Sequence, residues 1–295
     1  MSRLALIVNP FASAVDEHRI GLVQEALAHH GDVQTFLTER RGHATELARL
    51  ASEDADAIFV FSGDGGFNEA ANGLEAASPP LGCIPGGGTS VFPRGLGIPR
   101  DPVRATEYLL AALEAGRTRQ VSLGSVNGRR FLFNAGLRFD AELVRRIEER
   151  RSRAGRPGDL AFVATLVKLI AEHRGRFEPV LEIDGLGRAA FVLVANADPY
   201  TYLGSIAVHV APQATHEAGL DVVAPTRVRR HQIPGMFRYV LTGRRQPPSV
   251  LAAHDVDRID VRCDRPLPLQ ADGEDLGDVT EALFEAERGA LRVLA

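Results

Sequence analysis

The residues best suited to chemistry lie in one short stretch, Ser62-Gly63-Asp64-Gly65-Gly66. A short apolar run from Ile58 to Phe61 precedes the stretch, and helix-forming residues follow it from Asn68 onward. This order predicts a strand, a glycine turn and a helix. Glycines allow positive φ and a close approach of an anion to the backbone, and a helix start supplies free N–H groups and the positive end of a dipole. The pattern indicates a phosphate-binding loop; the alternative is an ordinary Asp-Gly turn.

Lysine usage excludes the phosphate loops that depend on a lysine. Lys168 is the only lysine, although lysine and arginine together number 34. A Walker A loop and a protein kinase both require a lysine beside the phosphates, so neither can be present. The dinucleotide motif G-x-G-x-x-G fails too, because Asn68 stands where its third glycine should be.

Alternating strands and helices are expected to position this stretch within a first domain, residues 1–122. Strands are predicted at 4–10, 33–39, 57–61 and 81–85, and helices at 16–30, 44–51, from 67 and at 101–115. Such alternation predicts an open parallel sheet, whose ligands lie beyond the carboxyl ends of the strands. Asn9, Thr38, the Gly63 loop and the loop Gly86 to Ser90 would share that edge.

The pattern changes in residues 123–295, where short strand-like runs alternate with Asn-Gly, Asp-Gly and glycine-rich turns. This predicts a second, β-rich antiparallel domain. Helices are expected at 141–151 and 160–173, while 232–241 is ambiguous, and the last residues could pack back on the first domain. Asp272-Gly273 reads as a hairpin turn.

Composition narrows the class of protein. A net charge of −4 over 295 residues argues against nucleic-acid binding, and the two isolated cysteines argue against a disulfide framework. No apolar run reaches the roughly 18 residues of a membrane span, and the N-terminus reads as a first strand rather than a signal peptide. A cytoplasmic protein is expected. The oligomeric state stays open, a homo-oligomer included.

At the level of motifs, SGDGGFNEAANGL resembles the GGDGT-x-NE-x-x-NGL signature of the diacylglycerol kinase catalytic-domain family, which includes sphingosine kinases and bacterial soluble lipid kinases. The resemblance covers most of the chain and looks closest to the actinobacterial branch. The further matching pieces follow in the expected order: VNP, Thr38 before Gly42-His43-Ala44, IPGGGTSVFPRGLGIP, FNAGLRFDAELV, YTYLG, APQA, GLDV and ADGEDLGD.

The resemblance implies ATP-dependent phosphorylation of a lipid hydroxyl, with Mg²⁺, by an α/β domain and a β-rich domain with the active site in the cleft between them. It implies that Asp272 and Glu274 activate the acceptor hydroxyl and that Asp64 has a magnesium-linked role. Asn134 would be a hydrogen-bonding residue at the cleft edge. The implied nucleotide-binding residues are Asn9, Thr38, Ser62, Gly63, Asp64, Gly65, Gly66, Asn68, Gly88 and Thr89.

Four positions depart from the family pattern. Ser62 replaces the first glycine of the signature, Gly66 replaces its threonine, and Ser90 replaces an asparagine. His216-Glu217-Ala218 replaces a double aspartate, which leaves open the structural magnesium site of some relatives. The change at Gly66 removes one hydroxyl contact to phosphate.

A basic segment, Thr226 to Arg245, carries six arginines and no acidic residue, interleaved with apolar side chains. Such a mixture can contact an anionic membrane surface through Arg227, Arg229, Arg230 and Arg238, at the inner face of the membrane. The alternative is a helix packed on the second domain with a solvated cationic rim.

Three functions therefore compete. The first is a soluble kinase of diacylglycerol or a related lipid alcohol. The second is a kinase of a soluble acceptor, because NAD kinases share the Gly-Asp-Gly theme. The third is a catalytically weakened protein that binds nucleotide or lipid.

Overall fold

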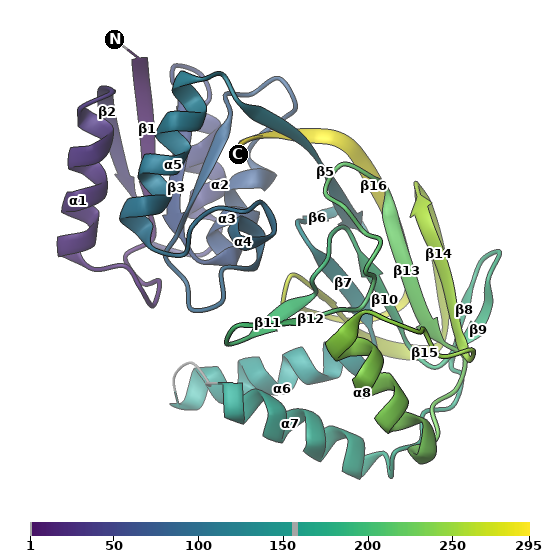
Figure 1. The fold of residues 1–295 in the computed structure, drawn as a ribbon. Coiled ribbons are helices and arrows are strands. Elements are labelled where there is room, and N and C mark those ends of the chain that lie inside the picture. The colour runs from purple at the N-terminus through teal and green to yellow at the C-terminus, as the bar shows by residue number, and fades with distance from the viewer. Residues whose placement is uncertain (1, 155–158) are drawn as a thin grey trace. The chain divides into compact units, whose positions relative to one another are not determined.

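The computed structural model describes residues 2–154 and 159–295 (Figure 1). The chain divides into two compact units, the first running to Leu123 and including Arg288–Ala295, and the second being Gly124–Glu287. Strands β5 (Thr118–Val126) and β16 (Glu274–Leu294) each begin in one unit and end in the other.

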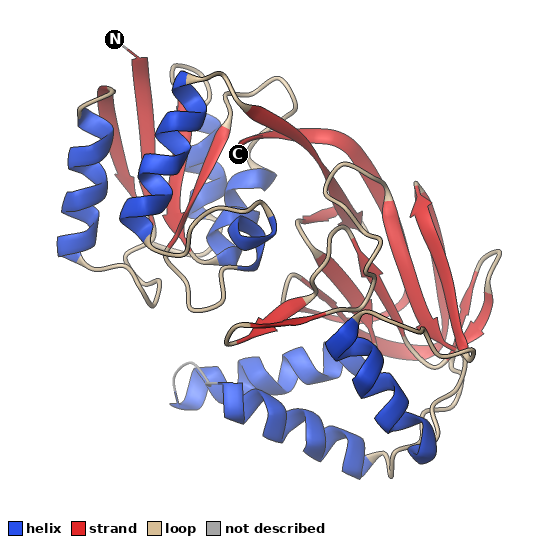
Figure 2. Cartoon of the chain, in the orientation of Figure 1, coloured by secondary structure: helices blue, strands red, loops and turns tan. Residues whose placement is uncertain are grey.

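The first unit is built on a parallel sheet in the order β2-β1-β3-β4, with the end of β16 beside β4 (Figure 2). Pairing of Val8 with both Leu37 and Phe61, and of Ser62 with Pro85, brings the carboxyl ends of all four strands to one edge. This confirms the predicted open parallel sheet. The strands are β1 (Ser2–Val8), β2 (Gly31–Leu37), β3 (Ala57–Ser62) and β4 (Leu81–Pro85).

Two pairs of helices accompany this sheet, α1 packing on α5 and α2 on α3. Every residue of β3 is buried, as expected of a strand covered on both faces. Asp16 and Asp101 cap α1 and α5, since their carboxylates accept the N–H groups of Arg19 and Arg104. The helices are α1 (Glu17–Ala28), α2 (His43–Ala51), α3 (Asp64–Asn72), α4 (Val91–Gly95) and α5 (Pro102–Glu114).

Two boundaries differ from the sequence-based expectation. Strand β2 begins at Gly31 rather than at residue 33. A Cβ on Gly31 would lie 2.3 Å from the carbonyl oxygen of Ser2, so glycine permits the pairing with β1. Helix α3 begins at Asp64 rather than Phe67, so Gly65 and Gly66 belong to its first turn.

The second unit contains antiparallel strands in the order β14-β13-β10-β7-β15-β16, as predicted for a β-rich domain. Buried side chains such as Phe131, Val194 and Phe284 form its core. The strands of that order, apart from β16, are β7 (Asn134–Leu137), β10 (Val192–Ala195), β13 (Leu220–Pro225), β14 (Val250–Val256) and β15 (Arg258–Ala271). The flanking strands are β6 (Arg129–Phe131), β8 (Leu181–Ile183), β9 (Gly187–Ala189), β11 (Thr201–Leu203) and β12 (Ile206–Val208).

Helices of the second unit fall where the sequence predicted them. The ambiguous segment 232–241 is the helix α8, so its helical interpretation is the right one. In the part of the chain that is described, no helix is both long and apolar enough to cross a bilayer. The helices are α6 (Phe139–Ala154), α7 (Asp159–Glu172), the short 3₁₀ helix η1 (Arg230–Gln232) and α8 (Ile233–Thr242).

Candidate active-site elements

The first candidate element is the carboxyl edge of the parallel sheet. Backbone hydrogen bonds join the segments that leave the strands: Asn9 N–H donates to the Phe61 carbonyl at 3.0 Å, and Thr38 N–H donates to the Val8 carbonyl at 2.9 Å. Gly86 N–H donates to the Ser62 carbonyl at 2.7 Å. The structure therefore brings Asn9, Thr38 and the two glycine segments together, as their positions after successive strands indicated.

Helix α3 directs its N-terminus to this edge. Its N-cap, Gly63, is extended and supplies no side-chain acceptor, while its carbonyl accepts from Gly66 and Phe67. The N–H groups of Asp64 and Gly65 lie ahead of this bonding, at the positive end of the helix dipole. Gly65 is exposed, and a Cβ there would meet nothing within 4 Å. The first turn can therefore receive an anion such as a phosphate.

None of the three glycines at the start of α3 has a positive φ, so that part of the sequence interpretation was wrong, and at Gly66 the reason for glycine is close packing. Gly63, Gly65 and Gly66 are absent from the positive-φ residues of the described chain. A Cβ on Gly66 would lie 2.1 Å from Ser62 Oγ and 2.6 Å from Ser62 Cβ. A Cβ on Gly87 would lie 2.9 Å from the Cα of Gly63, so the two glycine segments approach each other closely.

Ser62 and Gly66 are thus a matched pair. The Ser62 hydroxyl is buried and meets no hydrogen-bond partner among the described residues. The serine side chain fills the space that a side chain at position 66 would need.

This packing predicts strong coupling between the two positions. Gly66→Ala is expected to lower the free energy of unfolding by about 1–3 kcal/mol, because rotation of Ser62 moves its Oγ but not its Cβ out of the way. Ser62→Gly should restore most of that loss in the double variant. Urea unfolding of the wild type, both single variants and the double variant measures the coupling. Additive effects would show that the clash is relieved elsewhere.

Asp64 has a structural role that the sequence did not reveal. Its Oδ1 accepts the N–H of Phe92 at 3.0 Å, at the start of α4. The N-cap of α4, Ser90, has a φ of 50° and gives no side-chain cap, so Asp64 supplies that acceptor from another helix. The carboxylate therefore fixes the segment Gly86 to Ser90 beside α3.

The remaining predicted nucleotide residues divide between buried and exposed positions. Asn68 is buried, and its Oδ1 accepts from Asn72 at 3.0 Å. Gly88 is exposed and Thr89 half-buried. Glu69, which could have met nucleotide, instead accepts the Ala44 N–H at 3.2 Å and so caps α2.

The second candidate element is the turn between β15 and β16. Ala271 pairs with Glu274, which leaves Asp272 and Gly273 as a two-residue loop with φ of 48° and 79°. Positive φ at both positions is the type I′ geometry that favours Asp-Gly, so the predicted hairpin turn is confirmed. Glu274 is paired with Arg129, and both side chains are partly exposed.

The carboxylate of Asp272 is held by backbone donors. Its Oδ2 accepts the N–H of Leu132 at 2.6 Å, and its Oδ1 accepts those of Phe133 and Asn134, both at 3.1 Å. Three N–H donors favour the ionised carboxylate and fix its orientation. A rigid negative charge therefore sits at the tip of this hairpin.

A buried polar network lies behind the turn, and sequence reasoning missed it. Gln270 accepts the Gly273 N–H at 2.9 Å and donates to Asn134 Oδ1 at 3.0 Å. Gln270 and the Tyr200 hydroxyl both donate to the buried carboxylate of Asp140. Each of three sequence motifs contributes at least one residue to this network: FNAGLRFDAELV, YTYLG and ADGEDLGD. The polar residues beside apolar runs in these motifs were the sequence signal that could have indicated the network.

Asp140 predicts a pH dependence of stability. Burial raises its pKa from 3.8 to about 6, against the two donors that lower it. Because the folded pKa exceeds the unfolded one, Asp140 contributes stability below about pH 4 that is lost as pH rises through about 6. Asp140→Asn should therefore gain about 2–3 kcal/mol relative to the wild type between about pH 4 and about pH 8. Unfolding free energies measured across this range test it; parallel profiles would contradict it.

Magnesium has no complete protein cage among the described residues, where no group of three or more His, Cys, Asp or Glu side chains is placed to hold a metal. Mg²⁺ in kinases usually takes one or two carboxylates, waters and phosphate oxygens. Asp64, beside the α3 N-terminus, fits such a partial ligand set. The magnesium role of Asp64 stays a prediction.

Comparison with known proteins gives two family matches. The model of the diacylglycerol kinase catalytic domain matches residues 3–126, and that of the YegS C-terminal NAD kinase beta sandwich-like domain matches residues 135–295, more than half of the chain.

Curated relatives include a diacylglycerol kinase of Bacillus subtilis, 34% identical over 142 residues, which are 46% of this chain and 46% of that protein. Another is a diacylglycerol kinase of Staphylococcus haemolyticus, 35% identical over 104 residues, 34% of this chain and 30% of that protein. The chain thus matches less than half the length of these relatives.

Solved structures share the fold. A diacylglycerol kinase from Bacillus anthracis has a TM-score of 0.73 at 23% identity, covering 99% of this chain and 96% of that one. An NAD kinase from Archaeoglobus fulgidus in complex with ATP has a TM-score of 0.53 at 16% identity, covering 99% and 93%.

Proposed function

The chain belongs to the diacylglycerol kinase catalytic-domain family, and we propose that it transfers a phosphoryl group from ATP to the hydroxyl of diacylglycerol or a related lipid alcohol. The observation that carries the proposal is the α3 N-terminus at the carboxyl edge of the sheet, where Gly65 is exposed and a Cβ on it would meet nothing within 4 Å. Phosphoryl transfer requires mainly positioning and charge stabilisation, which such a site supplies.

In this proposal the phosphates of ATP bind the first unit. The first turn of α3 donates to phosphate oxygens through backbone N–H groups, that of the exposed Gly65 among them, with Thr89 on the neighbouring glycine segment. Asp64 would hold Mg²⁺, which neutralises phosphate charge when bound. Asn9 and Thr38 line the same edge and contact the nucleotide.

The acceptor hydroxyl is handled by the second unit in this proposal. Asp272 accepts the proton as the oxygen attacks phosphorus, and its three backbone donors keep the carboxylate oriented. Glu274 orients that group or helps to hold magnesium, and its pairing with Arg129 makes the orienting role the simpler one.

The deciding experiment incubates the protein with labelled ATP and magnesium and offers diacylglycerol, sphingoid alcohols, NAD or no acceptor. Label transferred to a lipid alcohol supports the proposal. Transfer to NAD would replace it by the soluble-acceptor alternative, in keeping with the NAD kinase fold similarity. ATP binding without transfer of label to any acceptor would support the third alternative, a protein that binds nucleotide but does not transfer phosphate.

We also propose a peripheral contact with anionic membranes, because the lipid acceptor resides in a bilayer. Arg229, Arg230 and Arg238 are exposed around η1 and α8, and Phe237 and Leu241 of α8 are 40% and 49% exposed. Arg227 is paired with Glu178, so its contribution should be smaller.

Charge reversal tests this contact. Arg229→Glu with Arg230→Glu should abolish most co-sedimentation with anionic vesicles, since each arginine contributes about 1 kcal/mol near such a surface. Wild-type binding should also weaken with added salt. The matched control is Arg100→Glu with Arg104→Glu, two exposed arginines of the first unit with the same change in charge. Equal binding by both double variants would favour the packed-helix alternative.

A further inference from the structure

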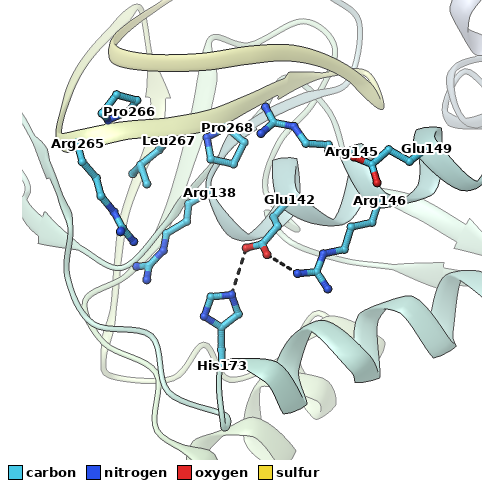
Figure 3. A pocket seen from close by; sticks show the side chains of 10 residues that line it. All are labelled: Arg138, Glu142, Arg145, Arg146, Glu149, His173, Arg265, Pro266, Leu267 and Pro268. Carbon is cyan, nitrogen blue, oxygen red and sulfur yellow. Dashed lines mark hydrogen bonds and ion pairs between the residues drawn. The ribbon is translucent and has the colours of Figure 1, made fainter.

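A pocket of about 410 Å³ with four arginines in its lining lies in the second unit (Figure 3). Its wall includes Arg138, which directly precedes α6, Arg145 and Arg146 of α6, and Arg265 of β15. Neither Asp272 nor Glu274 is part of its lining. No function assigned above uses this pocket.

Two of the four arginines are already neutralised. Arg145 donates to Asp275 at 2.6 and 2.9 Å, and Arg146 donates to Glu142 at 2.6 Å. Glu142 also contacts His173 at 3.1 Å, so this carboxylate serves two partners (Figure 3). The charge of Glu142 is thus shared, and its hydrogen bonds go to Arg146 and His173 rather than to Arg138 or Arg265.

Arg138 is held rigidly with part of its guanidinium unused. The residue is only 8% exposed, and its Nη1 donates to the carbonyls of Glu178 and Ala190, both at 2.7 Å. Its Nε and Nη2 form no hydrogen bond to a described residue. The backbone has a φ of 74°, which is costly for a residue with a Cβ. A buried cation in a strained conformation is thus oriented toward the pocket.

Arg265 supplies a second unbalanced charge. It is exposed on β15, and no ion pair or hydrogen bond joins it to a residue that the structure describes. Figure 3 shows its guanidinium directed toward that of Arg138. Burial and, next, the charge of Arg265 lower the pKa of Arg138, while the charges of Glu142 and Glu178 raise it. An anion placed between the two groups would relieve this repulsion.

We propose that Arg138 and Arg265 form a binding site for a phosphate monoester or free phosphate dianion. Two guanidinium groups carry the charge that a doubly ionised phosphate balances, and the planar donor fork of arginine matches two phosphate oxygens. The ligand is either inorganic phosphate or the headgroup of a phosphomonoester lipid, which share this chemistry. The site is independent of the proposed kinase reaction.

The test measures binding without ATP or magnesium, so it does not depend on turnover. Inorganic phosphate is titrated by calorimetry, and vesicles of phosphatidylcholine with or without phosphatidate are assayed by co-sedimentation. Arg265→Gln is the test variant, because the fold loses no described hydrogen bond with it. Arg262→Gln is the matched control, an exposed arginine on the same strand outside the pocket lining.

Saturable binding of phosphate by the wild type and Arg262→Gln, weakened by about tenfold or more in Arg265→Gln, supports the site with a free anion as ligand. The same dependence on Arg265 seen only with phosphatidate vesicles supports the site with a lipid headgroup as ligand. Circular dichroism establishes that both variants are folded. Binding of both probes that is absent, or equal in Arg265→Gln and Arg262→Gln, overturns the proposal.

Discussion

Asp272→Asn is expected to lower lipid phosphorylation by about 10²- to 10⁴-fold and to leave ATP affinity unchanged. The amide keeps the size of the carboxylate but cannot accept the proton of the attacking hydroxyl. Asparagine also tolerates the positive φ of 48° at this position, so the hairpin should persist. Turnover with saturating ATP and a separate ATP titration measure the two quantities.

The same change has a structural cost that must be measured beside activity. One carboxamide oxygen can replace only part of the acceptor capacity that now serves Leu132, Phe133 and Asn134. Leaving a buried N–H unpaired costs about 1–3 kcal/mol, so the variant should unfold at lower urea concentration. Assays are therefore run where unfolding curves show the variant fully folded.

Two control variants distinguish a catalytic base at Asp272 from a carboxylate that only stabilises the turn. Asp264→Asn removes an exposed carboxylate of β15 that is paired with Arg188 of β9, and should leave turnover near the wild-type value. Glu274→Gln should have a milder effect if Glu274 only orients, and greater magnesium dependence if it binds the metal. Wild-type turnover by a folded Asp272→Asn protein would place the base elsewhere, with Asp64 the next candidate.

The features that could be predicted from sequence are those set by local pattern. Buried strands such as Phe59 to Phe61 and the capped helix start at Asp101 carry their signals in adjacent residues. Alternation of strands and helices along the chain then predicts that the strands are parallel. The carboxyl ends of parallel strands lie at one edge of the sheet. For this reason the sequence alone predicts that Asn9, Thr38 and the glycine segments lie together.

Long-range packing decided what could not be predicted. Asp272 is anchored by Leu132, 140 residues earlier, and Asp64 caps a helix that begins 27 residues later. The helix start at Asp64 depends on Gly66 packing against the Ser62 side chain. Helix propensities of single residues do not predict this contact. Arg138 and Arg265 likewise face one pocket from distant parts of the chain.

Gly65→Val is expected to weaken ATP binding by about 100-fold or more while the protein stays folded. Charge-assisted hydrogen bonds contribute about 1.5–3 kcal/mol each, and an isopropyl group at this position would keep a phosphate from both the Asp64 and the Gly65 N–H. Folding should tolerate the change, since a Cβ there meets nothing within 4 Å and φ is not positive. ATP titration by calorimetry together with urea unfolding measures both expectations.

Gly21→Val is the matched control for this prediction. Gly21 also lies in a helix, is exposed, and would place its Cβ in open space, but no ligand contact is proposed for any residue of α1. Both variants add the same β-branched side chain to a helix, so their stability costs should be similar. Loss of ATP affinity in Gly65→Val alone would assign the phosphates to the α3 N-terminus, because only there does the added side chain cover backbone donors. Equal ATP affinities in the two folded variants would remove that helix end as the nucleotide site.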